Sequence, residues 1–418
     1  MQFKQYPSYK NSGVEWLGDV PEHWGVNRFC YLFDENKKKN IGLQETNVLS
    51  LSYGNIKEKN INDNKGLLPE SFETYQIIES NDIVFRFTDL QNDKRSLRSA
   101  ISKYHGIITS AYIAVKTKEN ADFYNYLFRA YDLQKVFYSM GEGMRQSLKM
   151  DELNKMPVVL PSKDEQKRIV SFLDTETARI DNLIAKQEKL IELLEEQRKS
   201  IISHAVTKGL NPNAPMKDSG VEWLGEVPEH WTISRVKFNF KNLDSRRIPL
   251  TSEERSYKKG NYPYYGASGI IDYIDNFIFD EDLVIFSEDG ANLIYRSMPI
   301  CFVATGKYWV NNHAHILKPF DELTTYWSYV LESVDVNLYI TGATQPKVTA
   351  ENLGNIFITF PPSFDERLSI HNYILEESSK IDILVLKQKS LIEKLKEYRA
   401  SIISHAVTGK IDVREFGA

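Results

Sequence analysis

The sequence predicts an α+β protein made of two copies of one unit, each a mixed α/β domain followed by a long helix. Three observations support this: short segments at the start and end of each half are nearly identical, each half mixes β-like and helical runs, and each half finishes in a heptad pattern. A long internal repeat indicates that both copies fold alike. With 418 residues in total, each copy is large enough for its own core.

Two repeated segments bound each half. Residues 11–24 read NSGVEWLGDVPEHW and residues 218–231 read DSGVEWLGEVPEHW, while RKSIISHAVTKG at 198–209 returns as RASIISHAVTGK at 399–410. We expect the Trp and aliphatic residues of the first motif to dock onto the domain or the helices. A protein with approximate two-fold character suits a two-part target, and duplex DNA with two half-sites is the commonest one.

The mixed parts contain apolar runs bounded by Gly, Asn and Asp, which is typical of strands. In the first copy we expect strands within 47–53, 82–87 and 107–115 and helix within 123–140. In the second copy the corresponding runs are 282–290, 298–306 and 314–320, with helix within 323–334.

A proline ends the last β-like run in each copy and begins a helix, because proline suits a first helical turn. A capping box is expected in both copies, from Ser162 with Glu165 and from Ser363 with Glu366. The helices then follow heptads over 163–204 and 364–405, about 60 Å each at 1.5 Å per residue. One apolar stripe on so long a helix needs a partner, and the other copy is the obvious one.

The seam positions repeat every seven residues in both helices. They are Leu173, Ile180, Gln187 and Leu194, then Ile374, Ile381, Gln388 and Leu395. Apolar companions lie beside them at Leu183, Ile184, Leu190, Ile191, Leu384, Val385, Leu391 and Ile392. The matched glutamines favour a role in fixing register, and the alternative is that each is tolerated at a wet seam.

Composition excludes several classes of protein. The 23 Tyr and 21 Phe argue for packed cores, the isolated Cys30 and Cys301 form no disulfide framework, and the apolar runs are too short for a signal peptide or membrane helix. We therefore expect a soluble, cytoplasmic protein. The net charge of −5 counts against DNA binding, although residues 235–259 hold eight basic and three acidic residues and predict a local basic face.

Motifs for catalysis are missing from the sequence. It has no GxxxxGK[ST] phosphate loop, no glycine-rich loop with an Asn/Asp-Pro-Pro-aromatic motif for adenine methylation, and no assembled nucleophile. His313 and His315 would share one face of a strand, but no further ligand lies near in sequence, so hydrogen bonding is favoured over metal binding. The sequence predicts a non-enzymatic binder without a metal or cofactor.

Candidate DNA contacts gather in polar, glycine-punctuated segments. Glutamine can bind an adenine edge and arginine a guanine edge, and glycine allows close approach. From the segments before the long helices we select Arg145, Gln146, Lys149, Gln345 and Lys347. From residues 85–100 we add Arg86, Thr88, Gln91, Lys94, Arg95 and Arg98, and from the second copy Tyr265, Ser268, Lys307, Asn311, Asn312 and His313. The alternative is that these residues make turn and strand-edge hydrogen bonds or lie in solvated loops.

Over nearly all its length the chain resembles the specificity subunit of Type I restriction-modification systems. The resemblance is carried by residues 143–174 and 342–370, by SIISHAVTGK, and by the Pro-x-x-x-Glu-Gln element at Pro161–Gln166. The second copy departs from this element, with Glu366-Arg367 in place of Glu-Gln, so that helix start is expected to be capped differently.

This resemblance implies two target-recognition domains, at 1–160 and 211–360, separated by antiparallel paired helices at 161–210 and 361–418. Each domain would read half of a bipartite DNA target, and the helices would fix the spacer and dock two methyltransferase subunits. S-adenosylmethionine, ATP and Mg would belong to those methyltransferase subunits and to restriction subunits, in a system of DNA methylation and phage defence. The alternative from the residues is a coiled-coil adaptor between proteins that never touches DNA.

Overall fold

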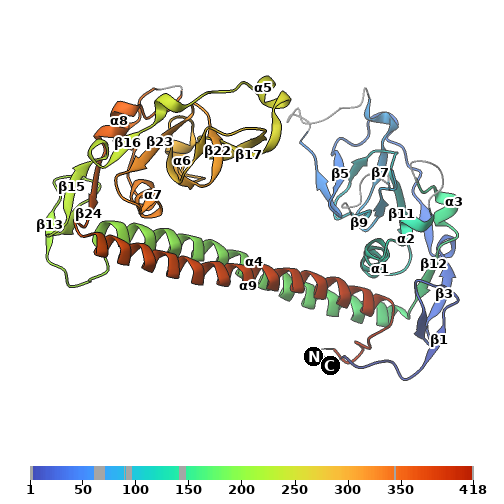
Figure 1. Cartoon of the computed structure of the whole chain (residues 1–418). Coiled ribbons are helices and arrows are strands. Elements are labelled where there is room, and N and C mark those ends of the chain that lie inside the picture. The colour runs from blue at the N-terminus through green and yellow to red at the C-terminus, as the bar shows by residue number, and fades with distance from the viewer. Residues whose placement is uncertain are drawn as a thin grey trace. The chain divides into compact units, whose positions relative to one another are not determined.

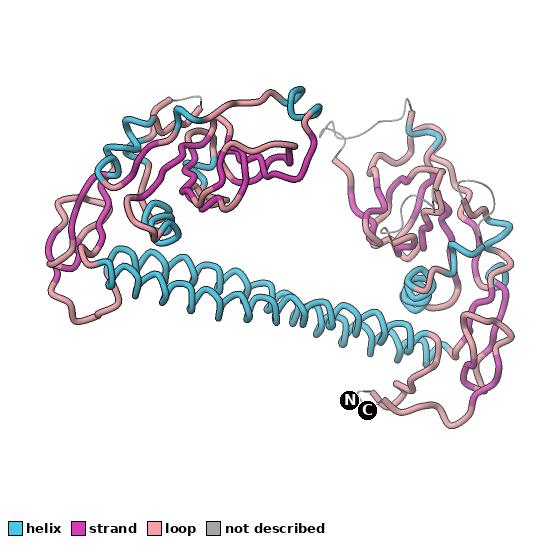
Figure 2. Tube along the Cα trace, in the orientation of Figure 1, coloured by secondary structure: helices cyan, strands magenta, loops and turns pink. Residues whose placement is uncertain are grey.

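The computed structural model describes residues 3–60, 71–88, 90, 97–140, 147–342 and 345–416. The chain forms two compact units, one of residues 1–187 with 389–418 and one of residues 188–388. Each unit combines a β-rich domain with parts of two long helices (Figures 1 and 2). In the part of the chain that is described, no helix is long and apolar enough to cross a membrane.

The first unit is built on an antiparallel sheet with strand order β4-β11-β8-β9. These strands are β4 (Phe33–Glu35), β8 (Ile83–Phe85), β9 (Ser99–Ile101) and β11 (Ile113–Thr117). Strand pairs beside it are β1 (Tyr9–Asn11) with β2 (Asp19–Pro21), β3 (Gly25–Arg28) with β12 (Pro157–Leu160), β5 (Leu49–Ser52) with β6 (Asn55–Glu58), and β7 (Gln76–Ile78) with β10 (Gly106–Ile108). The short helices are α1 (Ala121–Leu133), which packs on β9, α2 (Val136–Met140) and α3 (Met150–Leu153).

The second unit repeats this sheet with the order β16-β23-β20-β21. Its strands are β16 (Phe240–Asn242), β20 (Leu283–Ser287), β21 (Cys301–Ala304) and β23 (Ala314–Pro319). The repeat extends to β13 (Met216–Asp218) with β14 (Glu226–Pro228), β15 (Thr232–Arg235) with β24 (Phe357–Phe360), and the helices α7 (Thr324–Glu332) and α8 (Ala350–Asn355). The shared strand order confirms the predicted α+β duplication.

A further sheet in the second unit has the order β18-β17-β22-β19. Its strands are β17 (Lys259–Gly266), β18 (Gly269–Ile274), β19 (Phe279–Asp280) and β22 (Lys307–Val310), and the short helices α5 (Ser252–Tyr257) and α6 (Asn292–Tyr295) lie nearby in sequence. The copies therefore share a frame and differ in what is added to it.

The central strands are buried on both faces, which explains their unbroken apolar sequence. In β8, Ile83 and Phe85 belong to one core cluster, whereas Val84 between them belongs to another. In β20 the same alternation places Val284 in one cluster and Ile285 in a second. The corresponding strands of the two copies therefore have the same two-sided burial.

The long helices are α4 (Lys163–Lys208) and α9 (Phe364–Val407), slightly longer than predicted. In the first unit Ile180 of α4 shares a core cluster with Ile402 of α9. In the second unit Leu194 of α4 packs with Ile381 and Val385 of α9. The start of α4 thus pairs with the end of α9 and the end of α4 with the start of α9, which confirms antiparallel pairing (Figure 1).

Most predicted seam residues lie in the helix interface. Those buried are Leu173, Ile180, Leu194, Ile374 and Ile381, while Leu395 is partly buried and Gln187 and Gln388 are half-buried. The companion positions are divided. Val385 and Ile392 are buried and Leu183, Ile184 and Ile191 are half-buried, whereas Leu190, Leu384 and Leu391 are exposed. The seam therefore takes up part of the companion positions, and the others remain on the surface.

The repeated PEHW segment holds the start of the long helix in each copy. His23 Nε2 lies 2.9 Å from Glu165 Oε2, and His230 Nε2 lies 2.9 Å from Glu366 Oε2. The serine half of each predicted capping box is present, since Ser162 Oγ accepts from the Glu165 N–H. The glutamate carboxylates bind the motif histidines, which explains why these residue types recur together.

The repeated SGVEWLG segment receives the end of a long helix. Lys208 Nζ donates to the carbonyl oxygen of Leu224 at 3.1 Å in the second unit. Lys410 Nζ donates to the carbonyl oxygen of Leu17 at 3.0 Å in the first unit. The expected docking of the motif's apolar residues is confirmed, because Leu17 and Trp24 of the first copy and Leu224 and Trp231 of the second are buried. In the first unit the lysine follows the helix of the other copy.

Candidate nucleic-acid interface

In the second unit, three loops meet at the end of β20. The backbone N–H of Glu288 donates to the carbonyl of His313 at 3.0 Å, and the Glu288 carbonyl accepts from Val348 N–H at 2.8 Å. Gly290 N–H donates to the Pro346 carbonyl at 3.0 Å. The loop at 311–313 and the segment at 345–348 are therefore both attached to the residues that follow β20.

The turn between β17 and β18 is the third loop. Ser287 Oγ donates to the carbonyl of Ala267, and Asn311 N–H donates to the carbonyl of Tyr265 at 3.0 Å. The Tyr265 ring packs against Tyr308 in the core, and this burial raises the pKa of its hydroxyl. Of the predicted contacts, Tyr265 thus holds the loops through its backbone, while its ring supports the core.

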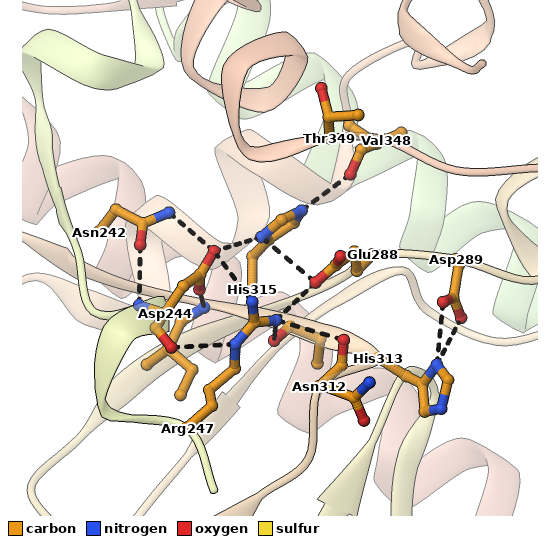
Figure 3. A network of polar contacts seen from close by, with 12 residues as sticks. Asn242, Asp244, Arg247, Glu288, Asp289, Asn312, His313, His315, Val348 and Thr349 are labelled. Atoms are coloured by element: carbon orange, nitrogen blue, oxygen red, sulfur yellow. Dashed lines mark hydrogen bonds and ion pairs between the residues drawn. The ribbon is translucent and has the colours of Figure 1, made fainter. Parts of the chain in front are cut away.

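A buried polar network lies beneath these loops (Figure 3). His315 is almost fully buried, with Nδ1 2.6 Å from Asp244 Oδ2 and Nε2 2.8 Å from the Val348 carbonyl. Burial opposes ionisation of Asp244, but hydrogen bonds from His315 and the Ile316 N–H leave its pKa below the usual range. His315 therefore has the hydrogen-bonding role favoured over metal binding. Among the described residues, no group of three or more His, Cys, Asp or Glu could hold a metal ion.

Glu288 is the buried anion of this network. Its Oε2 binds the guanidinium of Arg247, and its Oε1 lies 2.8 Å from Lys347 Nζ. Arg247 also donates to the carbonyl of Ala314 at 2.8 Å. Burial opposes ionisation of Glu288, yet Lys347 and Arg247 lower its pKa overall. The network thus joins the segment before α5, the end of β20, the start of β23 and the segment before α8.

The loops expose several of the predicted contacts. His313 Nδ1 lies 2.9 Å from Asp289 Oδ2 and its side chain is 48 % exposed, while Asn312 and Gln345 are also exposed. Asn311 is buried, and its Oδ1 accepts from the His313 N–H at 2.8 Å. The arrangement presents amide and imidazole groups, which can donate to or accept from base edges.

Two further predicted residues of the second copy differ in their surroundings. Ser268 is half-buried in the β17–β18 turn, next to the other loops. Lys307 lies at the start of β22, 3.9 Å from Asp280 and above the ring of Phe277. Lys307 is therefore outside the three-loop cluster.

The first unit has the same strand end, with Arg86 in the place of Ser287. Arg86 N–H donates to the Arg98 carbonyl at 2.8 Å, as Ser287 N–H donates to the Ile300 carbonyl at 2.7 Å. Arg86 is half-buried and Thr88 is exposed.

Arg98 requires a correction. It is fully buried, and its guanidinium reaches the Thr88 carbonyl at 3.3 Å and the Tyr138 hydroxyl at 3.4 Å. A side chain held this way inside the domain cannot contact DNA directly, so we remove Arg98 from the candidate contacts. Its burial follows from the strand that starts beside it, which sequence polarity alone does not reveal.

Lys149 remains a candidate contact of the first unit. It is exposed and precedes α3, and its N–H donates to Glu152. Because α3 begins at Met150 and α8 at Ala350, Lys149 corresponds to Thr349 and not to Lys347. Of the other candidate contacts, Gln91, Lys94, Arg95, Arg145 and Gln146 lie outside the described residues.

The sequence reading missed the residues that hold the loops. Arg247 belongs to the basic stretch 235–259 that predicted a basic face, yet it points into the network. Arg246 likewise pairs with Glu281 and lies over the ring of Phe279. The sequence signal for arginines paired inside the domain is the presence of Asp and Glu beside buried strands. This pattern is too common to identify the particular arginines that are paired.

Residues 100–193 and 228–402 match the family model described as "Type I restriction modification DNA specificity domain". The Type I restriction enzyme MjaVIII specificity subunit of Methanocaldococcus jannaschii is 24 % identical, over 99 % of this chain and 98 % of the relative.

Two solved structures share the fold. A chain from a study of complex assembly and conformational transition of the type I R-M system gives a TM-score of 0.64 at 15 % identity, covering 93 % of this chain and 98 % of the other. The HsdS subunit from Thermoanaerobacter tengcongensis gives 0.51 at 15 % identity, covering 96 % of this chain and 100 % of the other.

Proposed function

The chain belongs to the family of Type I restriction-modification DNA specificity subunits, and we propose that each of its β-rich domains reads one half of a bipartite DNA target. Subunits of this family are non-catalytic and carry no cofactor, because methyl transfer and cleavage lie in partner subunits. This membership decides against an adaptor that never touches DNA. Since such a system acts on the DNA of the cell, we expect the chain in the cytoplasm.

The observation that carries the proposal is a shared frame with different loops. Both units have the same four-stranded order and the same strand-end hydrogen bond, but Arg86 stands in the first unit where Ser287 stands in the second. The second unit adds the β17–β18 turn to its loop cluster. Identical frames that carry different loops suit two unlike half-sites, because base edges are distinguished by their donor and acceptor patterns.

In the second unit, Asn312, His313 and Gln345 are the proposed base-reading side chains. They are exposed on loops that are fixed to one strand end, so their positions relative to one another are held. In the first unit the candidates in the described residues are Arg86, Thr88 and Lys149. Phosphate contacts by surrounding Lys and Arg would add affinity without sequence preference.

The paired helices are proposed to set the spacer and to dock two methyltransferase subunits, with restriction subunits joining the assembly. In the second unit several large apolar side chains of the two helices are exposed outside the seam. They are Leu190, Leu193, Ile383, Leu384 and Leu386. Exposed apolar side chains gathered on one element often mark a protein interface, which supports partner docking here.

The test is methylation mapping followed by binding. The complex with its methyltransferase subunits should methylate one split sequence, and Asn312→Ala with Gln345→Ala should relax the choice of bases in one half of it only. Each lost base contact should reduce discrimination by about 1–3 kcal/mol. Unchanged specificity in the double variant would remove these loops from the reading surface, and loss of preference at both halves would contradict one domain per half-site.

A further inference from the structure

Lys347 is the cation of the loop cluster that most resembles a DNA phosphate contact, but its charge is already paired with Glu288. Its Nζ lies 2.8 Å from Glu288 Oε1, and the hydrogen bond with Glu288 raises the pKa of Lys347. Its backbone pairs with that of Thr341: the Lys347 N–H donates to the Thr341 carbonyl at 2.8 Å, and the Lys347 carbonyl accepts from the Thr341 N–H at 2.8 Å. A phosphate contact would have to compete with a nearly buried carboxylate for the same ammonium.

The Glu288 carboxylate in turn depends on Lys347. Arg247 occupies its other oxygen, and His315 Nδ1 lies 3.8 Å away. The carboxylate therefore faces three cationic or ionisable groups from three segments, and only Lys347 comes from the segment that carries Gln345. Removing Lys347 leaves Glu288 bound to Arg247 but detaches the ion pair that ties this segment to the strand end.

We propose that Lys347 is a positioning residue for base recognition, which sets the choice of bases through the Glu288 ion pair and does not bind DNA phosphate. The inference rests on the proposed reading function of the second domain. Backbone bonds from Gly290 to the Pro346 carbonyl and from Val348 to the Glu288 carbonyl hold the main chain of the segment, and the ion pair holds the Lys347 side chain to the strand end. With this side-chain attachment lost, Gln345 samples more orientations, and discrimination between bases falls before overall affinity does.

The two roles of a lysine differ in a measurable way. A phosphate contact contributes equally to binding of every sequence. It also makes the negative slope of log binding constant against log salt concentration steeper by about 0.9. A positioning residue changes discrimination and leaves that slope unaltered. Salt dependence and specificity measured on the same variant therefore separate the roles.

The experiment uses the complex assembled with methyltransferase subunits and a duplex carrying the mapped target. Lys347→Met keeps the aliphatic stem and removes the charge, and Lys347→Arg restores it. We expect Lys347→Met to reduce discrimination against single-base changes about tenfold in one half-site only, with an unaltered salt slope, and Lys347→Arg to recover most of the discrimination.

Lys318→Met is the matched control. Lys318 Nζ pairs with Glu281 Oε2 at 2.6 Å and is about as exposed as Lys347, at 53 % against 46 %, but Glu281 precedes β20 and lies away from the loops. The control should leave both discrimination and salt slope as in the unaltered chain. It therefore shows whether loss of any Lys–Glu pair in this domain has the same effect.

Three results would overturn the proposal. They are uniform weakening on all duplexes with a salt slope lower by about one, an unaltered discrimination, or an equal effect in Lys318→Met. If Lys347→Met unfolds the domain in a thermal melt, Lys347→Gln takes its place. This variant also removes the charge but still donates a hydrogen bond, and the same salt slope and discrimination are measured on it. If the complex with the unaltered chain shows no sequence preference, that result contradicts the proposed reading function and does not bear on the role of Lys347.

Discussion

Asp132 accepts a hydrogen bond from the backbone N–H of Arg98 at 2.7 Å, and Glu332 accepts the equivalent bond from Ile300 at 2.9 Å in the second unit. In each case a carboxylate at the end of a helix, α1 or α7, secures the start of a sheet strand. Burial raises the pKa of both carboxyl groups, although the backbone donors oppose this shift. Both copies keep this contact, although the acidic side chain is the shorter Asp132 in one and the longer Glu332 in the other.

Removing this acceptor should destabilise the first unit. Asp132→Ala leaves the Arg98 N–H buried without a partner, which costs about 1–3 kcal/mol in the free energy of unfolding. Asp132→Asn keeps an oxygen acceptor and should lose much less. Denaturant titration of the two variants measures the difference, and equal losses would show that the hydrogen bond is not the reason.

Glu332 predicts a pH dependence of definite sign. Because its pKa is raised in the folded state, the folded unit binds a proton that the unfolded chain has already lost. The free energy of unfolding attributable to Glu332 therefore falls as pH rises from about 4.3, its ordinary value, through the raised value. Glu332→Gln should remove this fall. If the free energy of unfolding of the unaltered chain instead rises with pH relative to that of Glu332→Gln, the assignment is contradicted.

The lysines after the long helices should each stabilise one unit. Lys410→Met removes the hydrogen bond to Leu17, and Lys208→Met removes the equivalent bond to Leu224. Hydrogen bonds from charged donors contribute about 1.5–3 kcal/mol, so each variant should lower one unfolding transition. Hydrogen exchange should find the loss of Lys410 in residues 11–24 and that of Lys208 in residues 218–231; exchange that is altered in neither motif would rule out this docking role.

The exposed apolar residues of the long helices should matter for assembly and not for folding. Leu386 is 66 % exposed, so Leu386→Asp should leave the thermal midpoint nearly unaltered and weaken capture of the methyltransferase subunit. Ile381→Ala is the contrasting variant, because this seam residue is buried and its truncation should cost about 2–5 kcal/mol. If the Leu386→Asp variant captures the methyltransferase subunit as the unaltered chain does, the partner surface lies elsewhere on the chain.

The proposed spacer role predicts a change of target with helix length. Deleting one heptad from α4 and the facing heptad from α9 should keep the seam in register, because the apolar pattern repeats every seven residues. Methylation mapping should then return the same half-sites with a shorter spacer. An unaltered spacer would exclude the helices as its determinant.

Much of the fold was predictable because its signals are periodic or repeated. The heptads gave both helices to within a few residues, and the strand runs at 82–87 and 282–290 became β8 and β20. The helix expected over 123–140 is divided into α1 and α2, and Lys135, with φ of 63°, lies between them. Nothing in the local pattern marks that break.

The candidate interface was less predictable because polarity does not reveal direction. Asn312, His313 and Gln345 are exposed as a contact would require, whereas Arg98 and Arg247 have the same chemistry but point inward. Which arginine is buried depends on carbonyls and carboxylates brought from distant parts of the chain. Such partners follow from the topology, and no spacing rule in the sequence encodes them.

The first unit depends on residues that are synthesised after the whole of the second unit. Its core includes Ile402, Val407 and Val413, and the Asp412 N–H donates to the carbonyl of Lys4 at 2.8 Å. During translation the second unit, residues 188–388, can close as soon as it leaves the ribosome, while the earlier-made domain waits with part of its apolar interior uncovered. A nascent chain halted before residue 389 would therefore be vulnerable to proteases near its beginning, not near its point of arrest.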